Sequence, residues 1–147
     1  MVYLGLDLGS KTCGVSISDR TSTIASSVEV IRYNNEDELL LRLDEIIYTR
    51  GVDAIVLGNP LNLDGSESDR TKISIEFKEL LEKRYNKEVF MMDERLSTVE
   101  AERLSTVEAE RMLISNDTRR KNRKKVIDKI ASTIILQAYL DKRKNEK

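Results

Sequence analysis

The sequence contains no histidine, no tryptophan, one cysteine and one proline among its 147 residues. The absence of histidine excludes an imidazole general base, a Ser-His-Asp triad and any zinc site built on histidine. The lone Cys13 excludes an intrachain disulfide, and its place in an apolar alternation predicts a small core residue rather than a nucleophile. Any chemistry must therefore come from carboxylates, lysines, hydroxyl groups or a bound metal ion.

Long apolar runs are also missing. No run approaches the ~20 residues needed to span a bilayer, and Asp7 comes too early for a basic-then-apolar signal sequence. Hydrophobic residues make up 39% and charged residues 35%, which is typical of one globular domain over residues 1–147. We expect a cytoplasmic protein without membrane contact.

Charge is unevenly distributed along the chain, although the net charge is only −1. Residues 119–147 carry 11 lysines and arginines against 3 acidic residues, whereas residues 1–118 carry 14 against 23. A basic C-terminal quarter on an acidic body is typical of a protein that contacts a polyanion at one end. A solvated helix face would give the same pattern. With aromatic residues at only 5%, stacking of bases on an aromatic platform is expected to be minor.

Apolar patterns predict most of the secondary structure. Alternation predicts three strands joined as an antiparallel meander, and a continuous apolar run predicts a buried parallel strand. Helical spacing predicts two helices, the first of which ends at Gly51. The predicted strands cover 2–8, 13–18, 24–31, 53–58 and 88–92, and these two helices cover 34–50 and 66–84.

The rest of the chain has a helical pattern, with a final helix over 126–140. The element order βββαβαβα predicts an α/β fold with a five-stranded mixed sheet and helices on its faces. The final helix is expected to bury one stripe, formed by Ile127, Ile130, Ala131, Ile134 and Ala138.

An eight-residue segment occurs twice in tandem, at 96–103 and 104–111. One repeat of eight residues cannot form a solenoid, so we interpret it as a local duplication inside a single domain. Each copy contains a Ser-x-x-Glu capping box that can start a helix. One copy is expected to dock in the ordinary register, while the other extends the helix or forms a loop.

Three acidic positions stand out as candidate metal ligands. Asp7 lies in the middle of an apolar strand, where an unpaired carboxylate costs several kcal/mol if it is buried. The pair Asp93-Glu94 follows the fifth strand, at the end where ligands of α/β sheets collect. Asp128 lies beside the apolar stripe of the last helix. Each could also be structural, as a carboxylate held by backbone amides, a helix cap or a salt bridge.

Four motifs then identify a family resemblance. They are residues 5–11 with Gly14 and Val15, residues 58–66, residues 93–98, and residues 123–131. In this order and spacing the chain resembles the YqgF/RuvX-type nucleases of the RNase H-like superfamily. That family is associated with pre-16S rRNA processing and has also been called Holliday junction resolvases. The resemblance covers nearly the whole chain.

The resemblance implies a metal-dependent nuclease with an RNase H-like fold, acting in 5′-end processing of pre-16S rRNA during ribosome biogenesis. Its metal ligands and catalytic carboxylates would be Asp7, Glu94 and Asp128, holding two Mg²⁺ or Mn²⁺ ions. Nucleic-acid contacts would come from side chains near these carboxylates and from the basic run before Asp128: Lys11, Asn59, Arg95, Arg119, Arg120, Arg123, Lys124 and Lys125. We expect a monomer or a weak homodimer.

The chain departs from the family at two places. Many related resolvases carry an acidic residue at the end of the fourth strand, whereas residues 58–60 here are Gly-Asn-Pro, so Glu94 would take that role. The family pattern also has one copy of the segment that is duplicated here, which affects how Glu94 and Arg95 sit relative to the following helix.

Three alternatives remain open from the sequence. A resolvase of branched DNA would act as a dimer, because two symmetric cuts need two sites. A nucleotide-binding module is possible because actin-like ATPases share this sheet, although they duplicate the domain and this chain has a single copy. A nucleic-acid-binding protein without catalytic activity would bind its substrate and leave it intact.

Overall fold

The computed structural model describes residues 1–60, 69–93 and 120–145, with the side chains of the last helix described over 131–144. Five strands and three helices are present in these ranges. In chain order they are β1 (Tyr3–Leu8), β2 (Thr12–Ser18), β3 (Ala25–Arg32), α1 (Glu36–Arg50), β4 (Ala54–Asn59), α2 (Asp69–Tyr85), β5 (Val89–Asp93) and α4 (Arg120–Asn145). The duplicated segment and the predicted start of the second helix lie outside the described residues.

The strands form one mixed sheet in the order β3-β2-β1-β4-β5. β1, β2 and β3 pair antiparallel, and β4 and β5 add to β1 in parallel. Two parallel crossovers, through α1 and α2, follow the meander, because parallel neighbours need a long connection. The predicted five-stranded mixed sheet is therefore confirmed.

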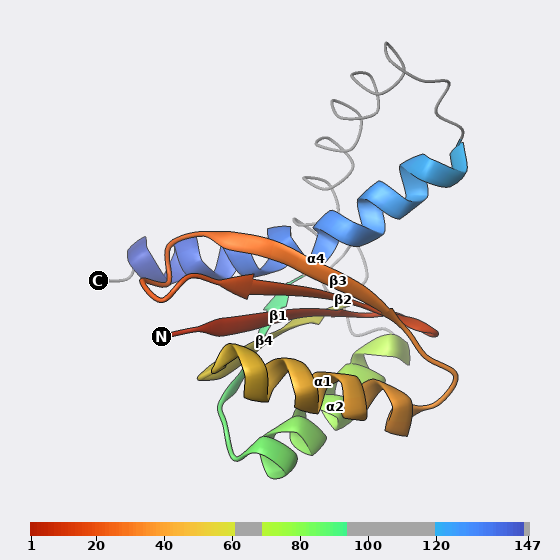
Figure 1. The fold of residues 1–147 in the computed structure, drawn as a ribbon, viewed down its shortest axis with the longest axis horizontal. Coiled ribbons are helices and arrows are strands. Elements are labelled where there is room, and N and C mark those ends of the chain that lie inside the picture. Colours follow the sequence, from red (N-terminus) through yellow and green to blue (C-terminus); the bar gives the residue numbers. More distant parts are fainter. Residues whose placement is uncertain (61–68, 94–119, 146–147) are drawn as a thin grey trace.

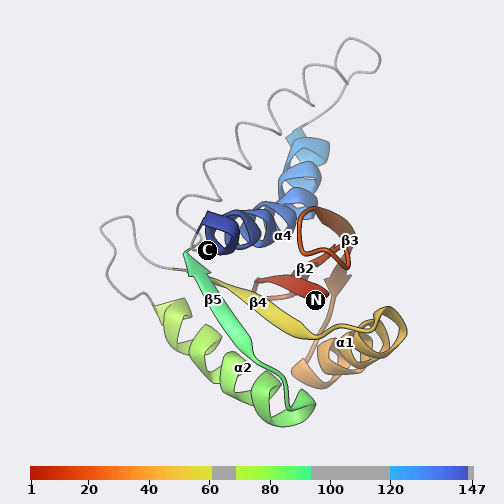
Figure 2. The same ribbon diagram turned by 90° about the vertical axis from the view of Figure 1, so that its left-hand side faces the viewer.

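Helices cover both faces of this sheet. In Figure 1, α4 lies on one side of the strands, while α1 and α2 lie together on the other side. Figure 2, turned by 90°, shows the same three layers, with α2 under β4 and β5 and with α1 beside it. Each strand therefore has one face toward the helix pair and one face toward α4.

Side-chain alternation divides the core into two clusters. Leu4, Leu6 and Leu8 of β1 belong to a large cluster with buried residues of α1 and α2, including Leu43 and Leu81. The second cluster is smaller and lies under α4; its buried members are Tyr3, Ala54, Val56, Ile135, Leu136 and Leu140. The two clusters fix which residues of each strand face which layer.

The boundaries of α1 follow ordinary capping rules. The Asn35 side chain accepts a hydrogen bond from the Glu38 backbone N–H, and the Glu38 carboxylate accepts from the Asn34 N–H, 2.9 Å away. At the other end Gly51 adopts a left-handed conformation, with φ 62° and ψ 48°. Because a residue with a Cβ is strained there, glycine is favoured at this position, as predicted.

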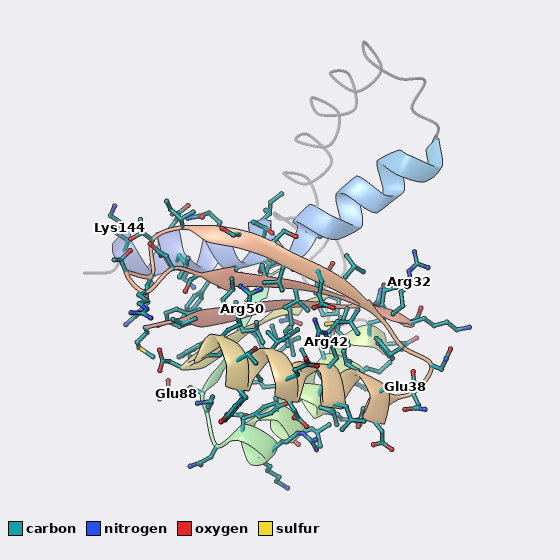
Figure 3. All side chains as sticks on the ribbon, in the orientation of Figure 1. Arg32, Glu38, Arg42, Arg50, Glu88 and Lys144 are labelled. Carbon is teal, nitrogen blue, oxygen red and sulfur yellow. The ribbon has the colours of Figure 1, made fainter. Side chains whose placement is uncertain are left out.

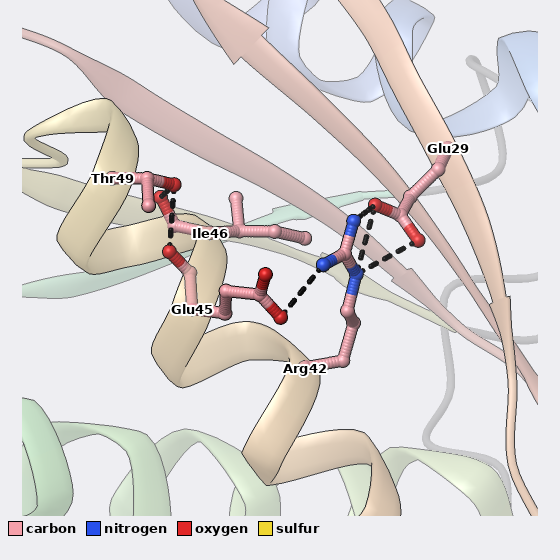
Figure 4. A network of polar contacts seen from close by, with 5 residues as sticks. All are labelled: Glu29, Arg42, Glu45, Ile46 and Thr49. Carbon is pink, nitrogen blue, oxygen red and sulfur yellow. Dashed lines mark hydrogen bonds and ion pairs between the residues drawn. The ribbon is translucent and has the colours of Figure 1, made fainter.

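Charged side chains connect the outer edge of the sheet to α1. The Arg42 guanidinium donates to Glu29 on β3 and forms an ion pair with Glu45 one turn along its own helix, at 2.8 Å. Figure 4 shows the guanidinium between the two carboxylates, with the Thr49 hydroxyl bonded to the Glu45 carbonyl nearby. The network is partly exposed, so it aligns α1 more than it stabilises the fold.

The buried face of α4 differs from the prediction. Ser132, Ile135, Leu136 and Leu140 are buried, whereas Ile134 and Ala138 of the expected stripe are only partly buried. The helix has apolar residues on more than one side, so its sequence alone did not indicate which side meets the sheet. Small residues of the sheet determine which side of α4 is buried, because they allow one row of helix residues to approach the strands closely.

Candidate metal centre and nucleic-acid interface

Asp7 lies on the face of β1 that points toward α4. Its neighbours Leu6 and Leu8 are in the core with α1 and α2, so alternation turns the half-buried Asp7 side chain to the opposite layer. Asp7 is paired with Gly14 on β2. On the β4 side Leu6 is in register with Leu57, so the next step places Gly58 beside Asp7. Both positions beside Asp7 on the neighbouring strands are therefore glycines, which have no side chain.

The helix α4 approaches the sheet closely next to this position. A Cβ placed on Gly5 would lie 2.7 Å from the Leu136 Cβ and 3.1 Å from the Ser132 carbonyl oxygen. The buried Ser16 hydroxyl donates to that same Ser132 carbonyl at 2.8 Å. Gly5 and Ser16 therefore determine how closely α4 packs on the strand that carries Asp7.

The direction of α4 follows from its contacts along β1. The Tyr3 ring lies 5.6 Å from the Tyr139 ring, whereas Gly5, two residues further along the strand, meets Ser132 and Leu136. The helix therefore runs antiparallel to β1. The Asp128 side chain lies outside the described residues, but its backbone position is in α4, one turn before Ser132.

The end of β5 helps to decide whether Asp93 or Glu94 is the better candidate for the metal ligand. Phe90 and Met92 pack under α4, and Met91 packs in the cluster on the other side. By the same alternation, Asp93 belongs to the side of Met91, away from Asp7. Asp93 also makes interactions of its own. Glu94 lies outside the described residues.

Asn59 ends β4 and is in register with Asp93. Because Leu57 packs in the cluster with α1 and α2, alternation places Asn59 on that side, on the face opposite to Asp7. Its side-chain oxygen is buried and has no hydrogen-bond partner among the described residues. The structure therefore does not bring Asn59 and Asp7 onto one face.

The turn after Asp7 is held by two side chains that the sequence reasoning missed. The Arg70 Nη2 donates to the Leu8 carbonyl at 2.6 Å, and the Tyr33 hydroxyl donates to the Gly9 carbonyl at 2.5 Å. Partial burial raises the pKa of Tyr33 above its usual value, so the hydroxyl keeps its proton and remains a donor. Neither residue belongs to a recognisable motif, and only the tertiary contacts identify them.

Predicted nucleic-acid contacts are described in part. Lys11 is exposed in the turn between β1 and β2 and makes no ion pair within the described ranges. Arg120, Arg123, Lys124 and Lys125 belong to the first turns of α4, although their side chains lie outside the described residues, as do Arg95 and Arg119. Figure 3 shows Arg32, at the Lys11 end of β3, and Lys144 of α4 at opposite ends of the molecule.

Cys13 is a core residue, as expected. Its side chain is fully buried, and burial, followed by the nearby charge of Asp7, raises the pKa of the thiol far above its usual range. A protonated thiol is a poor nucleophile at neutral pH. Cys13 therefore contributes packing in the cluster with α1 and α2 and does not act as a nucleophile.

Among the described side chains, those of residues 1–60, 69–93 and 131–144, no group of three or more acidic or cysteine residues is close enough to hold a metal ion. Of the three predicted ligands, only the Asp7 side chain is described. No helix within residues 1–60, 69–93 and 120–145 is long and apolar enough to cross a membrane.

Relatives of known family match nearly the whole chain. A family model described as "RuvX: Holliday junction resolvase" matches residues 1–104 and 101–142, so the two matches overlap inside the duplicated segment. A protein of Bacillus pumilus, named a candidate pre-16S rRNA nuclease, is 48% identical over 96% of this chain and 98% of its own. The Bacillus subtilis protein of the same name is 46% identical over the same shares.

Solved structures show the same fold at low sequence identity. Thermus thermophilus RuvC, in complex with a Holliday junction substrate, aligns with a TM-score of 0.56 and 13% identity over 98% of this chain and 96% of RuvC. The fowlpox virus resolvase also gives 0.56, with 16% identity over 97% and 99% of the two chains. The fold is therefore RNase H-like, and the family match and sequence relatives together show that the chain belongs to the RuvX family of nucleases.

Proposed function

We propose that this chain is a metal-dependent nuclease that hydrolyses phosphodiester bonds of structured RNA during 5′-end processing of pre-16S rRNA in the cytoplasm. The observation that carries the proposal is the position of Asp7. A carboxylate on an otherwise apolar central strand, between two glycines and facing α4, is suited to binding a cation. The names of the relatives, at 42–48% identity, favour this RNA substrate.

Asp7, Glu94 and Asp128 would hold the metal, and Mg²⁺ or Mn²⁺ suits an all-oxygen ligand set. Alternation along β5 supports Glu94 over Asp93, because Asp93 is on the face away from Asp7. The observed stripe of α4 supports Asp128, since residue 128 precedes the buried Ser132 by one turn. The step from Gly5 to Asp7 along β1 and the step from Ser132 to Asp128 along α4 each cover about 6–7 Å. Because Gly5 lies against Ser132 and the helix is antiparallel to the strand, Asp128 is expected at the level of Asp7.

When bound, two such ions would lower the pKa of a bound water and stabilise charge on the leaving oxygen. The protein would orient the substrate. Lys11, exposed in the turn after Asp7, is suited to neutralising a phosphate, and Arg95 is proposed for the same role. The basic start of α4 would follow the nucleic-acid backbone without reading its sequence.

Cleavage of a four-way DNA junction is the second candidate function, favoured by the description of the family model. The two functions differ in the assembly they need. Resolution of a junction requires two sites in a dimer, whereas processing of one RNA strand needs a single site. We propose a monomer or weak homodimer, so sedimentation at the assay concentration separates the candidates together with substrate preference.

The decisive experiment measures cleavage of a labelled structured RNA and of a four-way DNA junction with Mg²⁺, with Mn²⁺ or with EDTA. Asp7→Asn is the test variant, and Asp37→Asn, an exposed carboxylate in the first turn of α1, is the matched control. We expect metal-dependent cleavage of the RNA that falls on the order of 10³-fold or more in Asp7→Asn and is unchanged in Asp37→Asn. Binding without cleavage under every metal would instead indicate a non-catalytic protein.

The Glu94 assignment needs a separate comparison. We expect Glu94→Gln to weaken Mn²⁺ binding by at least about tenfold and Asp93→Asn to leave it nearly unchanged. A loss confined to Asp93→Asn would overturn the assignment of Glu94.

A further inference from the structure

The hydrogen-bond ladder between β1 and β4 has a gap immediately after Asp7. At its start the Val2 carbonyl accepts from the Ala54 N–H at 3.3 Å, and in a parallel ladder such bonds recur every second residue. Continuing along the strands, the fourth such carbonyl is that of Leu8, and the residue whose N–H would donate to it is Pro60. Proline has no N–H, so the ladder cannot supply a donor to the Leu8 carbonyl.

Arg70 supplies the missing donor from the first turn of α2. Its Nη2 lies 2.6 Å from the Leu8 carbonyl oxygen, and a guanidinium donor is charged at every physiological pH. The next residue, Thr71, donates its hydroxyl to the Pro60 carbonyl at 3.0 Å. The start of α2 is therefore fastened to the ends of both β1 and β4 at the point where the strands stop pairing.

Tyr33 holds the other side of the same turn. Its hydroxyl donates to the Gly9 carbonyl at 2.5 Å, and its backbone N–H donates to the Lys11 carbonyl at 3.0 Å. Within the turn, the Gly9 N–H donates to the Thr12 carbonyl at 2.7 Å. A Cβ on Gly9 would lie 2.9 Å from that oxygen, so glycine is needed for this tight closure.

Packing alone does not fix the turn from the α2 side. A cavity of about 570 Å³ lies beside it, lined by Leu8, Gly9, Tyr33 and Arg70 together with apolar and polar side chains of α1 and α2. Arg70 is exposed and makes no ion pair with a carboxylate within the described ranges. The two side-chain hydrogen bonds are therefore the contacts that hold the Leu8 and Gly9 carbonyls from that side.

We propose that Arg70 and Tyr33 are positioning residues of the nuclease centre, which hold the turn between β1 and β2 so that Asp7 and Lys11 keep their geometry for catalysis. The inference rests on the proposed function, because it concerns the same Asp7 site. Groups that orient a metal ligand from behind commonly change metal affinity or activity 10–100-fold when removed. A residue that only stabilised the fold would lower thermal stability and leave the kinetics of the folded enzyme unchanged.

Two matched controls lie at the other end of α2. Arg84 bonds Asp44 through its guanidinium, with Nε 2.8 Å from Oδ1, and the Tyr85 hydroxyl donates to the same oxygen at 2.6 Å. Arg84→Ala and Tyr85→Phe therefore remove the same chemical groups as the test variants, but from the end of α2 that lies away from Asp7. The test variants are Arg70→Ala, Arg70→Lys and Tyr33→Phe, each in the full chain.

The experiment measures kcat and KM on the structured RNA, Mn²⁺ affinity by calorimetry, and hydrogen exchange of the Gly9 amide in the metal-free protein. For Arg70→Ala and Tyr33→Phe we expect about tenfold lower kcat, about tenfold weaker Mn²⁺ binding and KM within about twofold of the wild type. Exchange of the Gly9 amide should be on the order of tenfold faster. Arg70→Lys should recover part of kcat, because an ammonium group can still donate to the carbonyl.

The controls should match the wild type in kcat, Mn²⁺ affinity and Gly9 exchange, even where they lower the Tm. Equal kinetic losses in the test and control variants would overturn the positioning role, as would test variants that change only the Tm. Asp7→Asn is measured alongside them. If Asp7→Asn is inactive while Arg70→Ala and Tyr33→Phe are normal, the inference fails and the proposed function stands; an active Asp7→Asn overturns both.

Discussion

The face of the sheet under α1 and α2 and the face under α4 differ in the size and polarity of their residues. The first is covered by large aliphatic side chains, such as Leu6, Leu43 and Leu57, all fully buried. The second has a smaller apolar cluster, combined with Gly5, the buried Ser16 and the half-buried Asp7. A large uniform core contributes most of the hydrophobic stabilisation, whereas Gly5 and Ser16 allow α4 to approach the sheet closely.

The two faces are expected to differ in how their substitutions affect stability and catalysis. Substitutions on the α1/α2 face are expected to change the free energy of unfolding with little effect on the turnover of the folded enzyme. Substitutions on the α4 face should affect turnover out of proportion to their effect on stability. The Arg70 and Tyr33 contacts are an exception that refines this division, because both residues lie on the α1/α2 side and reach the turn after Asp7.

The largest effect on stability is expected from Leu43→Ala. Leu43 is fully buried in the cluster between α1 and the sheet, so truncation leaves a cavity. We expect a loss of about 2–5 kcal/mol in the free energy of unfolding, measured with urea, and an unchanged kcat at a temperature where the variant is folded. A kcat that fell together with stability would contradict the separation of the two faces.

Gly5→Ala should give the opposite pattern. The added Cβ would lie 2.3 Å from the Ser16 hydroxyl oxygen and 2.7 Å from the Leu136 Cβ, so α4 must move away from β1. We expect a stability loss of about 1–3 kcal/mol. The kcat should fall on the order of tenfold or more, because a small displacement of a catalytic group is costly. If Gly5→Ala kept full activity, α4 would not contribute to the site.

The smallest effect is expected at the ion pair that joins α1 and α2 far from Asp7. The Arg84 guanidinium, helped by the Tyr85 hydroxyl and opposed by partial burial, holds the pKa of the Asp44 carboxyl below its usual value. A lowered pKa in the folded state stabilises the protein above the unfolded pKa of about 3.9 and loses this contribution as pH falls.

Asp44→Asn should therefore cost about 1 kcal/mol or less at pH 7, because the pair is partly exposed. The difference from the wild type should shrink as pH falls from 5 toward 3, as measured by urea unfolding at each pH. A difference that stayed constant with pH would show that the charge of Asp44 is not responsible.

Local patterns predicted the elements because each depended on neighbours in sequence. Alternation predicted the strand β1 with Asp7 in its middle, and Gly51 marked the end of α1. The order of three strands followed by two crossovers restricted the sheet to the arrangement that is observed. The same alternation along β5 separates Asp93 from the layer of Asp7.

Contacts between distant segments were not predictable in this way. The prediction of which residues of α4 are buried was wrong, because Ile134, Ile135 and Leu136 are all apolar and periodicity alone could not choose among them. Arg70 and Tyr33 carried no motif, and their roles depend on carbonyls 62 and 24 residues away. The register that makes Pro60 the residue whose N–H would donate to the Leu8 carbonyl exists only once the strands have paired.

The sequence by itself determined the mixed sheet, the place of Asp7 in the first strand and the family of the protein, because alternation and motif spacing are properties of neighbouring residues. The tertiary structure alone decided which side of α4 meets the sheet and which side chains hold the turn after Asp7. The physical reason is that both depend on contacts between segments far apart in the chain. The Ser16 hydroxyl reaches the Ser132 carbonyl because the helix packs closely on the sheet, and Arg70 gives the Leu8 carbonyl the hydrogen-bond donor that strand pairing does not supply.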